Sequence, residues 1–271
     1  MAPLGDRLGP LVSTDWLEYQ LHDEDVRIID CRFYSTEPAR GYEEYLAGHI
    51  PTASYFSLDD DMAAPVGPGR HPLPDPEEFA ARLRSAGIGD RHHVVVYDLA
   101  DAGNAARMGW MLRSLGHPET YVLDGGWTAW SAEPRSTTRE IPEWEPGDFA
   151  AAREWSGTID RDQILTDSDG LFLIDARAAE RYRGEVEPFD PVAGHIPGAF
   201  SLPYQDNTDD SGHFLSVEEL QERFRTISSK EPIVAYCGSG VTACNNILAM
   251  EIAGITDVLL YPGSWSDWCR N

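Results

Sequence analysis

The sequence contains the same series of short motifs twice, in the same order. Each series has an apolar run followed by aspartate, a Gly-His-Ile-Pro motif, a second apolar run and a pair of tryptophans. The matching segments are 28–32 and 173–177, 47–51 and 193–197, 94–98 and 233–237, and 123–130 and 261–268. Because the four matches keep their order at an offset of about 140 residues, they indicate that one domain has been duplicated.

Each half alternates short apolar runs with helical stretches. The expected strands are 26–30, 93–97, 121–123, 171–175, 233–236 and 258–261, and the expected helices are 76–86, 105–115, 217–226 and 241–253. Such alternation predicts an α/β fold with two tandem domains, each a mainly parallel sheet with helices on both faces. The stretch 133–152 lacks periodicity and reads as a linker. We therefore predict an N-terminal domain of residues 1–135, a linker of 136–154 and a C-terminal domain of 155–271.

The net charge of −25 on 271 residues limits the partners that the chain can take. It argues against nucleic acid and anionic membranes, and it means that a site for a small anion needs local arginines or backbone N–H groups. No apolar run approaches the ~18 residues of a membrane span, and the first ten residues do not resemble a signal peptide. The four cysteines are too few and too scattered for a disulfide framework, which favours the reducing cytoplasm.

A cysteine at the start of a glycine-containing loop is the candidate nucleophile. Cys237 begins the run Cys-Gly-Ser-Gly-Val-Thr, here called the cysteine loop (residues 237–242), between an expected strand and an expected helix. Gly238 and Gly240 allow the backbone to curl round the sulfur, so that several N–H groups point at it. Such a loop favours a thiolate, a persulfide or a bound oxyanion. The alternative, a buried structural cysteine, fits the flanking glycines poorly.

The paired motifs and the cysteine loop together resemble the two-domain rhodanese-type sulfurtransferases, over nearly the whole chain. The sequence of the loop resembles the 3-mercaptopyruvate sulfurtransferase branch. The resemblance implies an active site between the domains and a persulfide on Cys237, held by loop residues that include Gly238, Gly240, Val241 and Thr242. It also implies an inactive N-terminal domain, and Asp98 indeed stands where that domain would carry its cysteine.

The resemblance also implies roles for residues outside the cysteine loop. Arg181 matches an arginine that binds the carboxylate of the donor. His71 matches a catalytic histidine that works with Ser239 and with an aspartate, for which Asp59 is the best match and Asp60 a rival. The second substrate arginine of this branch is missing from 187–191, and Arg183 is a weak substitute.

Three further readings stay open or are excluded. A thiosulfate sulfurtransferase (rhodanese) is the main alternative, and a non-enzymatic sulfur carrier is a minor one. A phosphatase needs an arginine six positions after the cysteine, where Ala243 stands. We expect no metal or cofactor, because the chain lacks zinc-ligand spacing and a phosphate-binding glycine motif with its lysine. The expected acceptor is cyanide or a thiol such as thioredoxin, and the default assembly is a monomer.

The remaining repeated or conspicuous residues are expected to be structural. His49 and His195 occur in both halves, including the half without the cysteine, which favours a role in the fold. Arg177 is expected to pair with Asp175, and Cys31 and Cys244 to be buried in the core.

Overall fold

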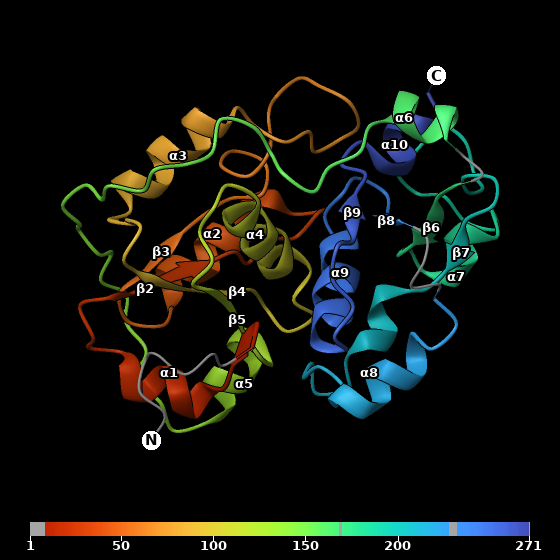
Figure 1. Ribbon diagram of the computed structural model, residues 1–271. Helices are drawn as coiled ribbons and strands as arrows, with labels where there is room; N and C mark the ends of the chain where they lie inside the picture. Colours follow the sequence, from red (N-terminus) through yellow and green to blue (C-terminus); the bar gives the residue numbers. More distant parts are fainter. Residues whose placement is uncertain (1–8, 168–169, 228–231, 271) are drawn as a thin grey trace.

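The computed structural model describes residues 9–167, 170–227 and 232–270 and shows two α/β lobes side by side (Figure 1). The N-terminal lobe holds a five-stranded parallel sheet in the order β1-β5-β4-β2-β3, and the C-terminal lobe a four-stranded parallel sheet in the order β7-β6-β8-β9. The strands are β1 (Leu11–Val12), β2 (Val26–Asp30), β3 (Ala53–Tyr55), β4 (His93–Tyr97), β5 (Thr120–Leu123), β6 (Phe172–Asp175), β7 (Phe200–Ser201), β8 (Ile233–Tyr236) and β9 (Leu259–Leu260).

Helices cover both faces of each sheet. They are α1 (Thr14–Gln20), α2 (Pro38–Ala47), α3 (Pro76–Ser85), α4 (Gly103–Ser114), α5 (Gly126–Ala132), α6 (Arg161–Thr166), α7 (Ala179–Tyr182), the 3-10 helix η2 (Tyr204–Asn207), α8 (Val217–Arg223), α9 (Ala243–Ile252) and α10 (Ser264–Trp268). Alternation along β4 explains the two layers, because Val94 and Val96 join the core under α3 and α4 while Val95 and Tyr97 join the core under α1 and α5. The predicted α/β fold is confirmed.

Duplication is visible in the contacts of the repeated motifs. Asp30 pairs with Arg32 and Asp175 with Arg177, each through a buried ion pair with closest atoms 2.7 and 2.6 Å apart. His49 stacks on Tyr45, and His195 stacks on Tyr182, with ring centroids 3.9 Å apart in both cases. These repeated residues therefore fasten the loops at the strand ends, as the sequence predicts.

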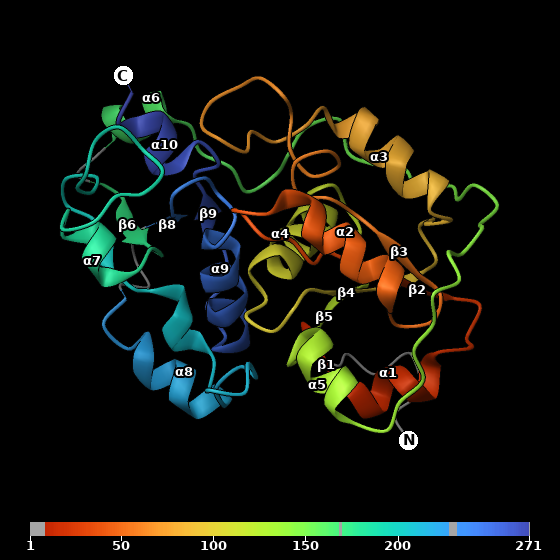
Figure 2. The same ribbon diagram turned by 180° about the vertical axis from the view of Figure 1, so that it is seen from behind.

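The two lobes meet along α4 and α9, which lie side by side in both views (Figures 1 and 2). One apolar cluster is continuous from Met108 of α4 to Leu248 of α9, and it also contains Cys31 and Cys244. Because this shared core sits directly beside the cysteine loop, it fixes the position of the N-terminal domain relative to Cys237.

Several elements differ from their predicted lengths. Helix α9 begins at Ala243 rather than at 241, because Val241 and Thr242 still belong to the cysteine loop. The predicted strand 258–261 shortens to β9, and the short strands β1, β3 and β7 have no clear signal in the sequence.

The segment between α5 and α6 follows the N-terminal lobe and packs on it. Phe149 is buried, and Thr138 exchanges backbone hydrogen bonds with His49.

The proposed domain limits of 1–135 and 155–271 remain predictions. Residues 1–8, on which the absence of a signal peptide was argued, lie outside the described residues. Among the described residues, no helix is long and apolar enough to cross a membrane.

Candidate active site

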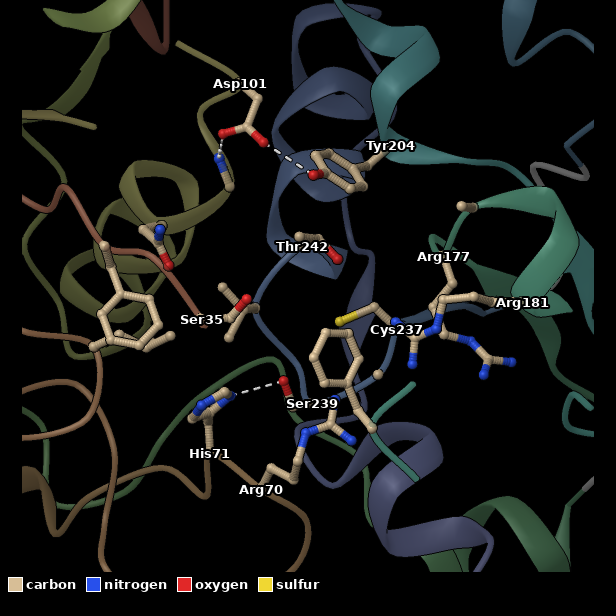
Figure 3. Close-up of a pocket in the computed structure, with 18 of the residues that line it drawn as sticks. Ser35, Arg70, His71, Asp101, Arg177, Arg181, Tyr204, Cys237, Ser239 and Thr242 are labelled. Atoms are coloured by element: carbon tan, nitrogen blue, oxygen red, sulfur yellow. Dashed lines mark hydrogen bonds between the residues drawn. The ribbon is translucent and has the colours of Figure 1, made fainter. Parts of the chain in front are cut away.

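A cleft of about 340 Å³ lies between the two domains, with Cys237 and Ser239 in its wall. The N-terminal domain contributes Arg70 and His71, and the C-terminal domain contributes Arg181, as Figure 3 shows. The structure therefore brings together residues that are far apart in the sequence. Arg70, His71 and Arg181 all line the cleft that contains Cys237, the candidate nucleophile.

The cysteine loop follows β8 and is held by α10. The Cys237 N–H donates to Ser264 Oγ (3.1 Å), and the Cys237 and Gly238 carbonyls accept from the Trp265 and Ser266 N–H groups (3.0 Å each). Gly240 has a φ of +74°, and a Cβ there would lie 2.6 Å from the Pro262 carbonyl oxygen. A glycine is required at this position because both the backbone angle and the available space exclude a side chain.

The cysteine loop stabilises the thiolate of Cys237 although the residue is only 2% exposed. Burial raises the pKa of the thiol, but hydrogen bonds from the Thr242 hydroxyl and from the Ser239 and Ala243 N–H groups outweigh it, so that the pKa is lowered. More of the nucleophilic thiolate is therefore present at neutral pH than for an ordinary cysteine.

Thr242→Val tests this account of the thiol, since valine keeps the shape and removes the hydroxyl. Loss of one hydrogen bond to the thiolate raises the pKa of Cys237. The alkylation rate of Cys237 should therefore begin to increase at a higher pH than in the wild-type protein. At pH 7 we expect iodoacetamide to react about tenfold more slowly. Thr128→Val, at an exposed residue of α5, is the control. An unchanged pH profile in Thr242→Val would contradict the assignment.

The predicted histidine and serine are in contact. His71 Nδ1 lies 2.8 Å from Ser239 Oγ, and His71 Nε2 lies 3.4 Å from an Asp59 oxygen. Asp59, rather than Asp60, thus faces the histidine, and the backbone oxygen of Asp60 instead accepts from Arg82. Burial, followed by the charges of Arg107 and Arg70, lowers the pKa of His71 to about 4. The histidine is therefore neutral at pH 7.

Arg177, Arg181 and Arg183, which follow Asp175 at the end of β6, have different environments. Arg181 lines the cleft and pairs with Glu187 (2.7 Å). Arg177 also lines the cleft, but its side chain is buried and is held by the expected partner Asp175 and by Glu187. Arg183 does not line the cleft and pairs with Glu185 (2.8 Å), so the structure gives no support to Arg183 as a substitute for the missing arginine.

Several residues of the cleft were missed by the sequence analysis. Arg70 lines the cleft directly before His71 in the sequence, and the buried Asp190 is its ion-pair partner. At another part of the cleft the Tyr204 hydroxyl donates to Asp101 across the two domains (2.9 Å). Adjacency to His71 was the one available signal for Arg70. Nothing in the sequence indicates that Tyr204 and Asp101 meet.

Asp98 occupies the matching loop of the N-terminal domain, and its carboxylate accepts hydrogen bonds from N–H groups of that loop and of the first turn of α4. The donors are the N–H groups of Ala102 (3.1 Å), Asn104 (2.9 Å) and Ala105 (3.1 Å). The same kind of N–H cradle thus surrounds a fixed carboxylate in one domain and a reactive thiolate in the other.

Comparison with known proteins identifies the family of this chain. The family model described as "Rhodanese-like domain" matches residues 13–133 and 160–271. A "Probable 3-mercaptopyruvate sulfurtransferase" of Pseudomonas aeruginosa is 43% identical over 95% of this chain and 94% of its own length. A "Thiosulfate sulfurtransferase" of Bos taurus is 36% identical over 95% of this chain and 91% of its own.

A solved structure supports the same assignment. The crystal structure of SseA from Escherichia coli, described as a 3-mercaptopyruvate sulfotransferase with the "Rhodanese" fold, superposes with a TM-score of 0.85 at 34% identity. The match covers 95% of this chain and 99% of that one. The chain therefore belongs to the rhodanese-like family and is a sulfurtransferase built from two rhodanese-like domains.

Proposed function

We propose that this sulfurtransferase takes its sulfur from 3-mercaptopyruvate and passes it, through a persulfide on Cys237, to a thiol or to cyanide. The observation that carries the proposal is the contact between His71 and Ser239 beside a stabilised Cys237 thiolate. Some relatives are named for 3-mercaptopyruvate and others for thiosulfate, at similar sequence identity to this chain. The choice of donor therefore rests on the chemistry of the cleft.

In the first step the Cys237 thiolate attacks the sulfur of mercaptopyruvate. An S–S bond forms, the C–S bond breaks, and its electron pair passes into the enolate of pyruvate. The proton of the donor thiol must then reach the enolate carbon to give pyruvate. Asp59 favours the tautomer of His71 with its proton on Nε2, which leaves Nδ1 to accept from Ser239. This pair can hold that proton and return it.

In the second step an acceptor thiolate or cyanide attacks the outer sulfur of the persulfide. The S–S bond breaks, and its electron pair returns to Cys237 as the thiolate, which restores the enzyme. The acceptor leaves as a persulfide or as thiocyanate. Low-molecular thiols and a thioredoxin remain acceptor candidates, and we propose a monomer in the cytoplasm. The net charge of −25 supports a protein that does not bind nucleic acid or anionic membranes.

Thiosulfate differs from mercaptopyruvate in a way that the site can detect. It carries two negative charges, whereas the cysteine loop offers no basic side chain. Its leaving group, sulfite, departs without protonation at carbon, so the Ser239–His71 pair has no proton to deliver. We therefore expect pyruvate release from mercaptopyruvate to exceed sulfite release from thiosulfate, measured as kcat/KM side by side with the same acceptor.

His71→Ala separates the two donors. Loss of the proton-handling pair should lower kcat/KM for mercaptopyruvate about 10²- to 10⁴-fold and leave the slower reaction with thiosulfate within about threefold of wild type. His22→Ala, at an exposed residue of the same domain, is the control. Equal losses with both donors would contradict the assigned role of His71.

A further inference from the structure

A second cation reaches the donor site from the N-terminal domain. A Cβ built on Gly238 would lie 2.7 Å from Arg70 Nη2 and 3.3 Å from both terminal nitrogens of Arg181. The two guanidinium groups therefore converge at the residue next to Cys237, and Figure 3 shows them approaching from opposite domains. Both also lie over the ring of Phe189, at 5.4 Å for Arg70 and 5.2 Å for Arg181.

The backbone around Arg70 is fixed to the C-terminal domain. The Arg70 N–H donates to Ser266 Oγ (3.0 Å), and the Ser266 N–H donates to the Gly238 carbonyl (3.0 Å). A Cβ on Gly69 would lie 2.5 Å from the Gly263 carbonyl oxygen, so the two loops are in close contact. Arg70 is thus preorganised against the cysteine loop although it belongs to the other domain.

A buried carboxylate holds this second cation. The side chain of Asp190 is fully buried and forms an ion pair with Arg70, while Arg181 lies 3.8 Å and Arg270 4.0 Å away. Within the described part of the chain, neither oxygen of Asp190 has a hydrogen-bond partner of good geometry. Asp190 is therefore a counter-ion shared among three arginines, with unused capacity to orient them.

The charges of this cluster leave a small surplus. Its cations are Arg70, Arg177, Arg181 and Arg270, and its anions are Asp175, Glu187 and Asp190. The cluster carries one net positive charge, which matches a donor with one carboxylate better than a dianion.

We propose that Arg70 and Arg181, one from each domain, together bind the carboxylate of the donor, and that Asp190 positions Arg70 and limits the site to one net positive charge. The inference rests on the proposed use of mercaptopyruvate and accounts for the absence of an arginine in 187–191. Substrate binding thereby requires both domains, and the ion pair between Arg70 and Asp190 sets the preference for a single anion.

Arg70→Gln tests the binding role with two donors. For mercaptopyruvate we expect KM to rise about 10- to 100-fold with little change in kcat, because a charge-assisted hydrogen bond is lost. For 1-mercapto-2-propanone, which has the same mercaptoketone but no carboxylate, kcat/KM should not change. Arg70→Lys should lose less than Arg70→Gln. Arg183→Gln, at an exposed arginine outside the cleft, is the matched control and should behave as wild type.

Asp190→Asn tests the role of Asp190 by removing a negative charge from the cluster, whereas Arg70→Gln removes a positive one. Removing one negative charge should raise the ratio of kcat/KM for thiosulfate to that for mercaptopyruvate at least about tenfold, since the surplus charge now favours a dianion. Glu185→Gln, which removes the exposed partner of Arg183, is the control. If Asp190→Asn does not fold, as judged by circular dichroism, the Arg70→Gln comparison decides the inference by itself.

The outcomes separate this inference from the proposed function. Wild-type protein that releases no pyruvate from mercaptopyruvate would overturn both. Wild-type protein that does so, combined with an Arg70→Gln variant that loses equal activity with both mercaptoketones or with neither, would overturn the inference alone. If the ratio of kcat/KM for thiosulfate to kcat/KM for mercaptopyruvate is unchanged or lower in folded Asp190→Asn, Asp190 does not limit the charge of the site.

Discussion

Replacing Cys237 by serine is expected to abolish sulfur transfer from every donor while leaving the protein folded. A hydroxyl is a poor nucleophile toward sulfur and cannot carry a transferable sulfur atom. The donors from Thr242, Ser239 and Ala243 remain able to hydrogen-bond the serine oxygen, so the loop should keep its shape. We expect kcat/KM to fall at least about 10⁴-fold, and the intact mass of the variant to gain no sulfur after donor treatment.

Cys244→Ala is the matched control for that experiment. Cys244 is also buried, seven positions later, but burial raises the pKa of its thiol to about 12, and its sulfur contacts the Gly240 carbonyl. It therefore stays protonated and inert, and the variant should still gain one sulfur atom per chain. Persulfide found on Cys244 in the Cys237→Ser protein would show that the nucleophile has been assigned wrongly.

The fold and the loop that carries the candidate nucleophile could be predicted from the sequence because their signals are local or repeated. The series of motifs in the two halves predicted a duplicated α/β domain, and the structure places its members in equivalent registers, with Asp30 opposite Tyr97 and Asp175 opposite Tyr236. The glycines beside Cys237 predicted a tight loop because few other residues adopt such backbone angles. A short strand such as β7 carries too few residues to show a period.

The donor site could be predicted only in part, because it forms where two domains meet. Arg181 and His71 were found by resemblance, but Arg70 takes its place through contacts with Ser266 and Asp190, which are far away in the sequence. The hydrophobic periodicity of the sequence carries no information about contacts between such distant residues. The choice between Asp59 and Asp60 likewise depended on which of two neighbouring carboxylates the loop turns toward His71.

The duplicated loop gives a physical reason for the prediction that the N-terminal domain is inactive. In both domains N–H groups surround the side chain of the residue that follows the central strand. Asp98 supplies a carboxyl group, whose pKa is raised to about 7 by burial and by the nearby charge of Asp101, and this group cannot carry a transferable sulfur. Cys237 instead supplies a thiolate, which can form a covalent bond to sulfur. The N-terminal domain contributes His71 and Arg70 to the cleft that contains Cys237.

Helix α4, which follows Asp98, also carries a buried arginine that contacts the cysteine loop. Arg107 of α4 is fully buried and donates to the carbonyls of Gly240 (3.1 Å), Met62 (3.0 Å) and His71 (2.9 Å). Its guanidinium thereby joins the cysteine loop to the segment that carries His71. Among the described residues no carboxylate forms an ion pair with Arg107, and its hydrogen bonds join carbonyls of both domains.

We expect Arg107→Met to lower kcat/KM for mercaptopyruvate about 100-fold, because a displacement of about 1 Å between the two loops has an effect of that size. The effect on stability should be smaller. Lost hydrogen bonds of about 1.5–3 kcal/mol each oppose the several kcal/mol recovered when a buried cation is replaced by an apolar chain, so Tm should move by less than about 5 °C. Arg113→Met is the matched control, because Arg113 lies on the same helix but donates to Thr120 away from the cleft. Full activity in folded Arg107→Met, or an equal loss in Arg113→Met, would show that the contact between α4 and the cysteine loop does not align the reacting groups.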